Sequence, residues 1–189
     1  MPTDPFETPG PPPAADLPLI DGLLEPWAGE IGPDYLGYRN HVCRVAHFCH
    51  ALRDLTVDER AKVLIAAAFH DLGIWTDDTF DYLDPSIALA NAYLAENGLD
   101  AWQPEIEAMI DLHHQVRPVG DARRPLVEVF RRADWIDVSL GALRFGLPRS
   151  TVRAVRAAFP DAGFHRRLVT LALERFSKHP LSPIPVLKW

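Results

Sequence analysis

Residues 62–73 read KVLIAAAFHDLG, an apolar run that closes on a histidine and an aspartate. The run is typical of a buried helix, where a carboxylate without a partner is costly to desolvate. The adjacent side chains of His70 and Asp71 therefore indicate that something binds them. Upstream, Thr56 and Glu59 form a capping box that predicts the start of this helix, and Gly73 predicts its end.

Further metal-capable side chains lie on both sides of this pair, and His113 and His114 form a second pair. Helical phase places four polar groups on the apolar faces of their helices: His41, His70, His113 and Asp134. Polar groups aimed into one apolar interior repel or stay unsatisfied unless a cation or a hydrogen-bond network joins them. We predict one divalent-metal site assembled from several helices.

The composition indicates one globular domain. The chain has 189 residues, 48% of them apolar and 24% charged, which is enough for one sizeable core. A net charge of −7 argues against nucleic-acid polymers and anionic membranes as partners, but it allows a nucleotide. We expect a cytoplasmic protein, because we find neither a signal peptide nor an apolar run of about 20 residues. Cys43 and Cys49 share one predicted helix, too far apart for a disulfide, which suits that compartment.

Helical periodicity runs through most of the chain. Apolar spacing and capping signals predict helices over residues 19–27, 35–53, 56–72, 85–98, 104–114, 125–143, 148–159 and 164–178. The acidic and aromatic segment 74–85 is either an active-site lid or a packed loop. We predict an all-α fold, a single compact helical domain over residues 19–179. Pro-rich tails flank it, disordered or extended at 1–18 and extended at 180–189.

Three segments resemble the motifs of the HD-domain superfamily of metal-dependent phosphohydrolases. They are Asn40–Ala46, Ala67–Gly73 and Arg132–Asp137, and the resemblance spans about residues 38–140. It implies a helical fold of the HD-domain type, a site with one or two metal ions, and hydrolysis of phosphate esters, often of nucleotides. The metal ligands that it implies are His41, His70, Asp71 and Asp134.

The chain departs from the family pattern in two places. Leu72–Trp75 holds no acidic residue, whereas some members place a further catalytic acid shortly after the His-Asp pair. His113–Gly120 lacks the glutamate and the Gly-Tyr-Pro segment that follow the double histidine in the cyclic-dinucleotide phosphodiesterases. Because the superfamily also contains hydratases and oxygenases, the metal site alone leaves the reaction open.

The ligand types and their neighbours predict a mechanism. Two imidazoles and two carboxylates suit Mn, Fe, Co, Ni or Zn, and Mg by abundance. We expect an activated water on this ion, with His113 or His114 completing the coordination or donating a proton to the substrate phosphate. We expect Asp71 to be catalytic as well as a ligand. Asp137, one turn beyond Asp134, either orients a ligand histidine or serves as a base.

The candidate phosphate contacts are arginines: Arg44, Arg131 and Arg117. The predicted function is a metal-dependent hydrolase, a phosphomonoesterase or phosphodiesterase, that acts on a small phosphate ester such as a nucleotide. One alternative is a hydratase or lyase that uses the same metal on a small nitrile-like or carbonyl substrate. The other is a helical module that serves as a ligand sensor. A homodimer stays open.

Overall fold

The computed structural model describes residues 16–79, 81–120 and 124–178, and it is built from helices. Over these ranges no strand is present, which confirms the predicted all-α class. The helices are, in chain order, α1 (Asp16–Leu24), η1 (Glu25–Trp27), α2 (Ala28–Ile31), η2 (Gly32–Asp34), α3 (Tyr35–Leu52), α4 (Val57–Phe69), α5 (Gly73–Thr76), α6 (Leu83–Glu96), η3 (Asp100–Trp102), α7 (Gln103–Leu112), α8 (Pro125–Val138), α9 (Arg149–Ala158) and α10 (Phe164–Lys178).

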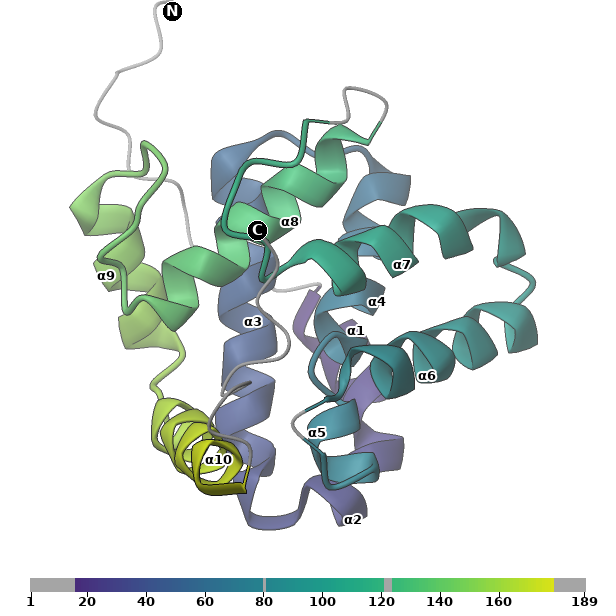
Figure 1. Cartoon of the computed structure of the whole chain (residues 1–189). Helices are drawn as coiled ribbons and strands as arrows, with labels where there is room; N and C mark the ends of the chain where they lie inside the picture. Colours follow the sequence, from purple (N-terminus) through teal and green to yellow (C-terminus); the bar gives the residue numbers. More distant parts are fainter. Residues whose placement is uncertain (1–15, 80, 121–123, 179–189) are drawn as a thin grey trace, which may run out of the picture.

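The helix α3 forms the centre of the molecule, because its side chains are buried on almost every side. Tyr38, Val42, Val45 and Phe48 have no exposed surface. The helix α8 crosses α3, and α6 and α7 run side by side at one edge of the molecule (Figure 1). Since α3 packs against both α4 and α8, residues from these three helices meet in the core.

The capping box at the start of α4 is confirmed. The Thr56 hydroxyl accepts a hydrogen bond from the Glu59 amide, and the Glu59 carboxylate accepts one from the Thr56 amide at 2.9 Å. The apolar run 63–69 that follows is buried throughout, so this helix is fixed at one end by its cap and at the other by the core.

The end of α4 differs from the prediction. The helix stops at Phe69 with His70 as its cap residue, and Gly73 begins the short helix α5 instead of closing α4. A Cβ on Gly73 would lie only 2.6 Å from the carbonyl oxygen of Tyr82, so a close approach of two backbone segments requires glycine here.

Two further boundaries were predicted wrongly. The helix α1 begins at Asp16, so residues 16–18 of the tail predicted for 1–18 are helical. Residues 1–15 of that tail and the 180–189 tail lie outside the described ranges. The helix α8 ends at Val138 and not at residue 143, because Leu140 (φ 56°) and Gly141 (φ 81°) take left-handed conformations. In the described part of the chain, no helix combines the length and apolarity that crossing a membrane requires.

Candidate metal centre

Four segments of the chain place metal-capable side chains in one buried cluster. The contributing residues are His41 from α3, His70 and Asp71 just after α4, His113 just after α7, and Asp134 from α8. His114 lies at the edge of this cluster and keeps 14% of its side chain exposed. The four predicted ligands and the inward-facing histidine of the His113-His114 pair are therefore neighbours in space.

The ligand atoms face one another at short range. Nε2 of His41 lies 2.9 Å from Nε2 of His70. The same His41 atom is 3.5 Å from Oδ2 of Asp71 and 3.6 Å from Oδ1 of Asp134. From Nε2 of His70 these two oxygens are 3.3 and 3.8 Å away. Neighbouring ligands of an ion with bonds of about 2.1 Å lie about 3 to 3.5 Å apart. The distances among His41, His70 and Asp71 match this spacing, and the two distances to Asp134 are slightly longer.

Hydrogen bonds on the far side of each ring fix which nitrogen faces the cluster. Nδ1 of His41 donates to Oδ2 of Asp137 at 2.7 Å. Nδ1 of His70 donates to the Ala67 carbonyl oxygen at 2.8 Å. Because the proton of each neutral ring is on Nδ1, the two Nε2 atoms present lone pairs to each other. Such a contact is repulsive unless a proton or a metal ion lies between them.

A second group of acceptors extends the cluster. Nδ1 of His113 donates to the Ile110 carbonyl oxygen at 2.6 Å, so its Nε2 is also an acceptor, 3.5 Å from Oδ1 of Asp71. In the described ranges, this Nε2, Oδ1 of Asp71 and both carboxylate oxygens of Asp134 are buried without a hydrogen-bond partner. Buried acceptors of this kind are rare in folded proteins and call for an explanation.

A divalent cation fits this donor set better than a proton does. One proton on His70 would join its Nε2 to that of His41, but it would leave the acceptors of His113 and Asp134 unsatisfied. A divalent ion binds several such atoms at once. The buried His and Asp groups can hold a metal ion, and the mixed nitrogen and oxygen donors suit a transition metal or Mg.

The charge states of the protein groups follow from burial and from the carboxylates. Burial lowers the pKa of His41 and, together with the nearby His114, lowers that of His113 to about 4, so both rings are neutral and ready to bind a cation. Burial also opposes charge on His70, but the neighbouring Asp71 outweighs it and raises the pKa of His70 to about 9. Without a metal, one proton therefore resides on His70.

Asp137 holds the His41 ring through a hydrogen bond to Nδ1, the geometry that one of its two predicted roles requires. It is fully buried behind the ring, on the Nδ1 side, and so points away from the ligand atoms. Two hydrogen bonds from Arg44, at 2.6 and 2.7 Å, hold the same carboxylate. Burial opposes ionisation, but His41 and Arg44 outweigh it and lower the pKa of Asp137 below its usual range. A carboxylate held in this way fixes the tautomer of a ligand histidine.

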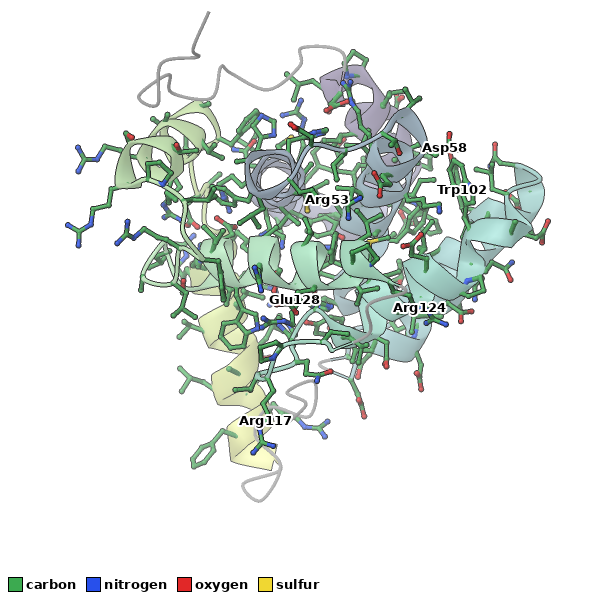
Figure 2. All side chains as sticks on the ribbon, turned by 90° about the horizontal axis from the view of Figure 1, so that it is seen from above. Arg53, Asp58, Trp102, Arg117, Arg124 and Glu128 are labelled. Carbon is green, nitrogen blue, oxygen red and sulfur yellow. The ribbon has the colours of Figure 1, made fainter. Side chains whose placement is uncertain are left out.

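Two of the three predicted phosphate contacts are wrong. Arg44 is 1% exposed, and its guanidinium is occupied by Asp137 and by the Phe159 carbonyl oxygen. Arg131 is 2% exposed and pairs with Glu128 through two bonds of 2.8 Å. Arg117 is exposed, and its side chain overlaps the ribbon of α10 in the view of Figure 2. The sequence places Arg44 three residues after His41, but it could not predict the carboxylate partners of Arg44 and Arg131.

The segment 74–85 contributes a residue that the sequence did not single out. The hydroxyl of Tyr82 lies 2.8 Å from Nε2 of His114, and the Tyr82 side chain is buried over the cluster. Trp75 packs against Tyr38, with ring centroids 4.6 Å apart, and donates to Asp34. The density of aromatic residues in this segment was the available signal. The described apolar residues of the segment pack against the core, whereas its aspartates are exposed: Ile74, Trp75, Tyr82 and Leu83 in the first group and Asp77, Asp78, Asp81 and Asp84 in the second.

Comparisons with protein-family models, curated proteins and solved structures gave no significant match for this chain. The case for a metal centre therefore depends on the distances, burial and hydrogen bonds of its own residues.

Proposed function

We propose that this chain is a metal-dependent phosphohydrolase of the HD-domain type that acts on a small phosphate ester, with nucleotides among the candidates. One observation carries the proposal: the Nε2 atoms of His41 and His70 each lie within 3.8 Å of carboxylate oxygens of both Asp71 and Asp134. In addition, Oδ1 of Asp71 and both oxygens of Asp134 are buried without a hydrogen-bond partner in the described ranges. When bound there, a divalent cation supplies a water of lowered pKa and polarises a phosphoryl oxygen.

The remaining residues position these groups and move a proton. Asp137 and the Ala67 carbonyl oxygen hold the rings of His41 and His70 with Nε2 turned to the ion. His114 is the partly exposed histidine, with Nδ1 3.4 Å from Asp134 and Nε2 bonded to Tyr82. In the proposal His114 donates the proton to the leaving oxygen of the ester, and Tyr82 holds its ring.

One observation favours a second candidate, a hydratase or lyase. A phosphate site is usually lined by cations, but Arg44 and Arg131 are turned to protein carboxylates. An uncharged substrate would need no such contacts. In the first proposal the metal ion itself supplies positive charge for the phosphate, so the absence of these arginines does not exclude it. The two candidates therefore differ in whether phosphate is released.

Phosphate release separates these candidates. The purified protein is loaded with Mn, Co, Ni or Mg and tested on a panel of nucleotides, and we expect phosphate release with at least one ion. Loaded protein that releases no phosphate from any member, but hydrates a small nitrile, would refute the first proposal and support the second.

A matched pair of variants tests the site itself. Asp71→Asn keeps the shape of the side chain and removes the charge that binds the ion. Asp58→Asn makes the same change at an exposed position in the first turn of α4 (Figure 2). We expect loss of bound metal and of turnover in Asp71→Asn only. Full metal content and full turnover in Asp71→Asn would exclude this centre.

A further inference from the structure

A second feature, apart from the metal centre, is a cleft of about 730 Å³ between α9 and the loop that follows α8. Four arginines line it: Arg144, Arg149, Arg153 and Arg156. Its volume lies within the range of small-molecule sites, roughly 300 to 1,000 Å³. Nitrogen-tipped side chains extend from α9 on the left of Figure 2. The cleft is therefore large enough for a small ligand and strongly cationic.

Most of the positive charge in this cleft has no counter-charge in the described part of the protein, since Arg156 alone of the four arginines lies near a carboxylate, 3.4 Å from Asp137. Among the described residues that line it, none is acidic. Arg149 and Arg153 form no ion pair with any carboxylate of the described ranges, although the whole chain carries a net charge of −7. Elsewhere arginines such as Arg39 and Arg131 are paired with carboxylates. Like charges that gather without a counter-charge repel one another, so the cleft favours an anion from solution.

The arginines of α9 form a row. Arg149, Arg153 and Arg156 are spaced four and three residues apart, and such positions lie on one face of a helix. From the first to the last, the row extends about 10 Å along the helix axis. A single phosphate would contact one or two of these guanidinium groups, whereas a chain of phosphates matches the whole row.

The opposite wall of the cleft approaches α9 closely. A Cβ on Gly141 would lie 2.7 Å from a methyl group of Val152, and Gly141 itself has a φ of 81°. Only glycine allows the loop to lie this close to α9. The loop also supplies Leu140 and Ala142, which give the cleft apolar surface beside its cations.

The cleft lies behind the metal centre. Arg156 is 3.4 Å from Oδ1 of Asp137, whose other oxygen binds Nδ1 of His41. The row of arginines is thus separated from the ligand atoms by the Asp137 carboxylate and the His41 ring. It offers a binding place outside the space in which the proposed hydrolysis takes place.

We propose that this cleft binds a small molecule with two or more linked phosphate groups, as in a nucleoside polyphosphate or an inorganic polyphosphate. The phosphates lie along Arg149, Arg153 and Arg156, and the apolar wall contacts a nucleoside where one is present. This proposal does not depend on the proposed hydrolysis, since it concerns binding alone.

Titration calorimetry on the metal-free full chain tests this site. The protein is treated with a chelator, desalted and titrated with inorganic triphosphate, so that binding through a metal ion cannot contribute. The variant is Arg153→Glu, and the control is Arg166→Glu, which reverses an exposed arginine of α10 outside the cleft. We expect saturable 1:1 binding to the unmodified chain, at least tenfold weaker binding to Arg153→Glu, and less than a twofold change in Arg166→Glu.

Two outcomes would overturn the proposal: no saturable binding at millimolar triphosphate, or equal losses in Arg153→Glu and Arg166→Glu, which would indicate general charge attraction. Circular dichroism shows whether Arg153→Glu is folded, and Arg153→Gln repeats the test with a smaller change of charge. A parallel titration with ATP identifies the source of the phosphates. Tighter binding than triphosphate assigns a nucleotide, and equal binding assigns the phosphate chain alone.

Discussion

The metal centre and the arginine cleft are opposite in charge and in access to solvent. At the centre, acceptors of Asp134 and His113 are buried and lack donors. At the cleft, donors of Arg149 and Arg153 are exposed and lack carboxylates. In the core between these regions, Arg44 and Asp137 show the opposite case, a buried cation and a buried carboxylate that pair with each other. In our two proposals the unpaired groups bind a ligand of the opposite charge, which is a small enclosed cation at the centre and a larger anion in the open cleft.

The largest effect is expected for a variant of the buried region. Asp134→Ala should abolish bound metal, because Oδ1 of Asp134 is 3.6 Å from Nε2 of His41 and accepts no hydrogen bond in the described ranges. The metal-free variant should lose little stability, because only longer contacts to histidines, such as His114 at 3.4 Å, join this carboxylate to its surroundings. Metal analysis checks the loss of bound metal, and thermal melting checks the stability of the metal-free variant. A large drop in stability without metal would indicate that Asp134 is a structural residue.

A smaller loss of metal affinity is expected for a variant of Asp137, which lies behind the His41 ring. Asp137→Asn should weaken metal binding by about 10- to 100-fold, the usual effect of removing a carboxylate that orients a ligand histidine. It should also destabilise the protein, because Arg44 keeps its buried charge without a counter-charge. Metal titration and chemical unfolding measure these effects. Arg156→Gln is the control, since Arg156 contacts the same carboxylate from the open cleft. Unchanged metal affinity in Asp137→Asn would contradict the orienting role of Asp137.

The two regions should also differ in how pH affects them. Burial opposes the charge on His70, but Asp71 holds its pKa at about 9. Below that pH a metal ion must displace the proton, so metal affinity should rise with pH by up to about tenfold per unit and level off above pH 9. Calorimetry in two buffers of different ionisation enthalpy counts the released proton. Triphosphate binding in the cleft should displace no proton from the protein, because arginine stays charged.

The smallest effect is expected for the stability of the ligand-free protein when an arginine of the cleft is replaced. Arg153→Gln should leave the stability of the ligand-free protein unchanged or raise it by up to about 0.5 kcal/mol, because it removes repulsion and breaks no ion pair. Urea unfolding measures this change. A loss of more than about 1 kcal/mol in the free energy of unfolding would show that Arg153 stabilises the fold. The arginine cleft would then not be a region of unpaired charge.

The elements that could be predicted from the sequence were those set by local pattern. Apolar periodicity and the Thr56 capping box predicted the helices and the inward face of His41, His70 and Asp134. Long-range partners were beyond this reasoning. The pairing of Arg44 with Asp137 joins residues 93 positions apart, and helical phase indicates only the face of a side chain. The prediction of phosphate contacts failed for that reason.

Loop conformation was the other feature that could not be predicted from the sequence. Gly73 was interpreted as a helix end, but it is glycine because Tyr82 packs against it. The early end of α8 depends on left-handed conformations at Leu140 and Gly141, and the arginine cleft exists only because of that turn. The charges of α9 were visible in the sequence, but the wall opposite them was not.

The packing of Phe164 on His41 has a practical consequence. The two rings are stacked with centroids 4.0 Å apart, so the first residue of α10 shields one face of a candidate ligand. A version of the protein trimmed before Phe164 would let water reach that imidazole from the side. The last helix thus limits the access of water to a candidate metal ligand, and a chain shortened to ease crystallisation would expose that ligand.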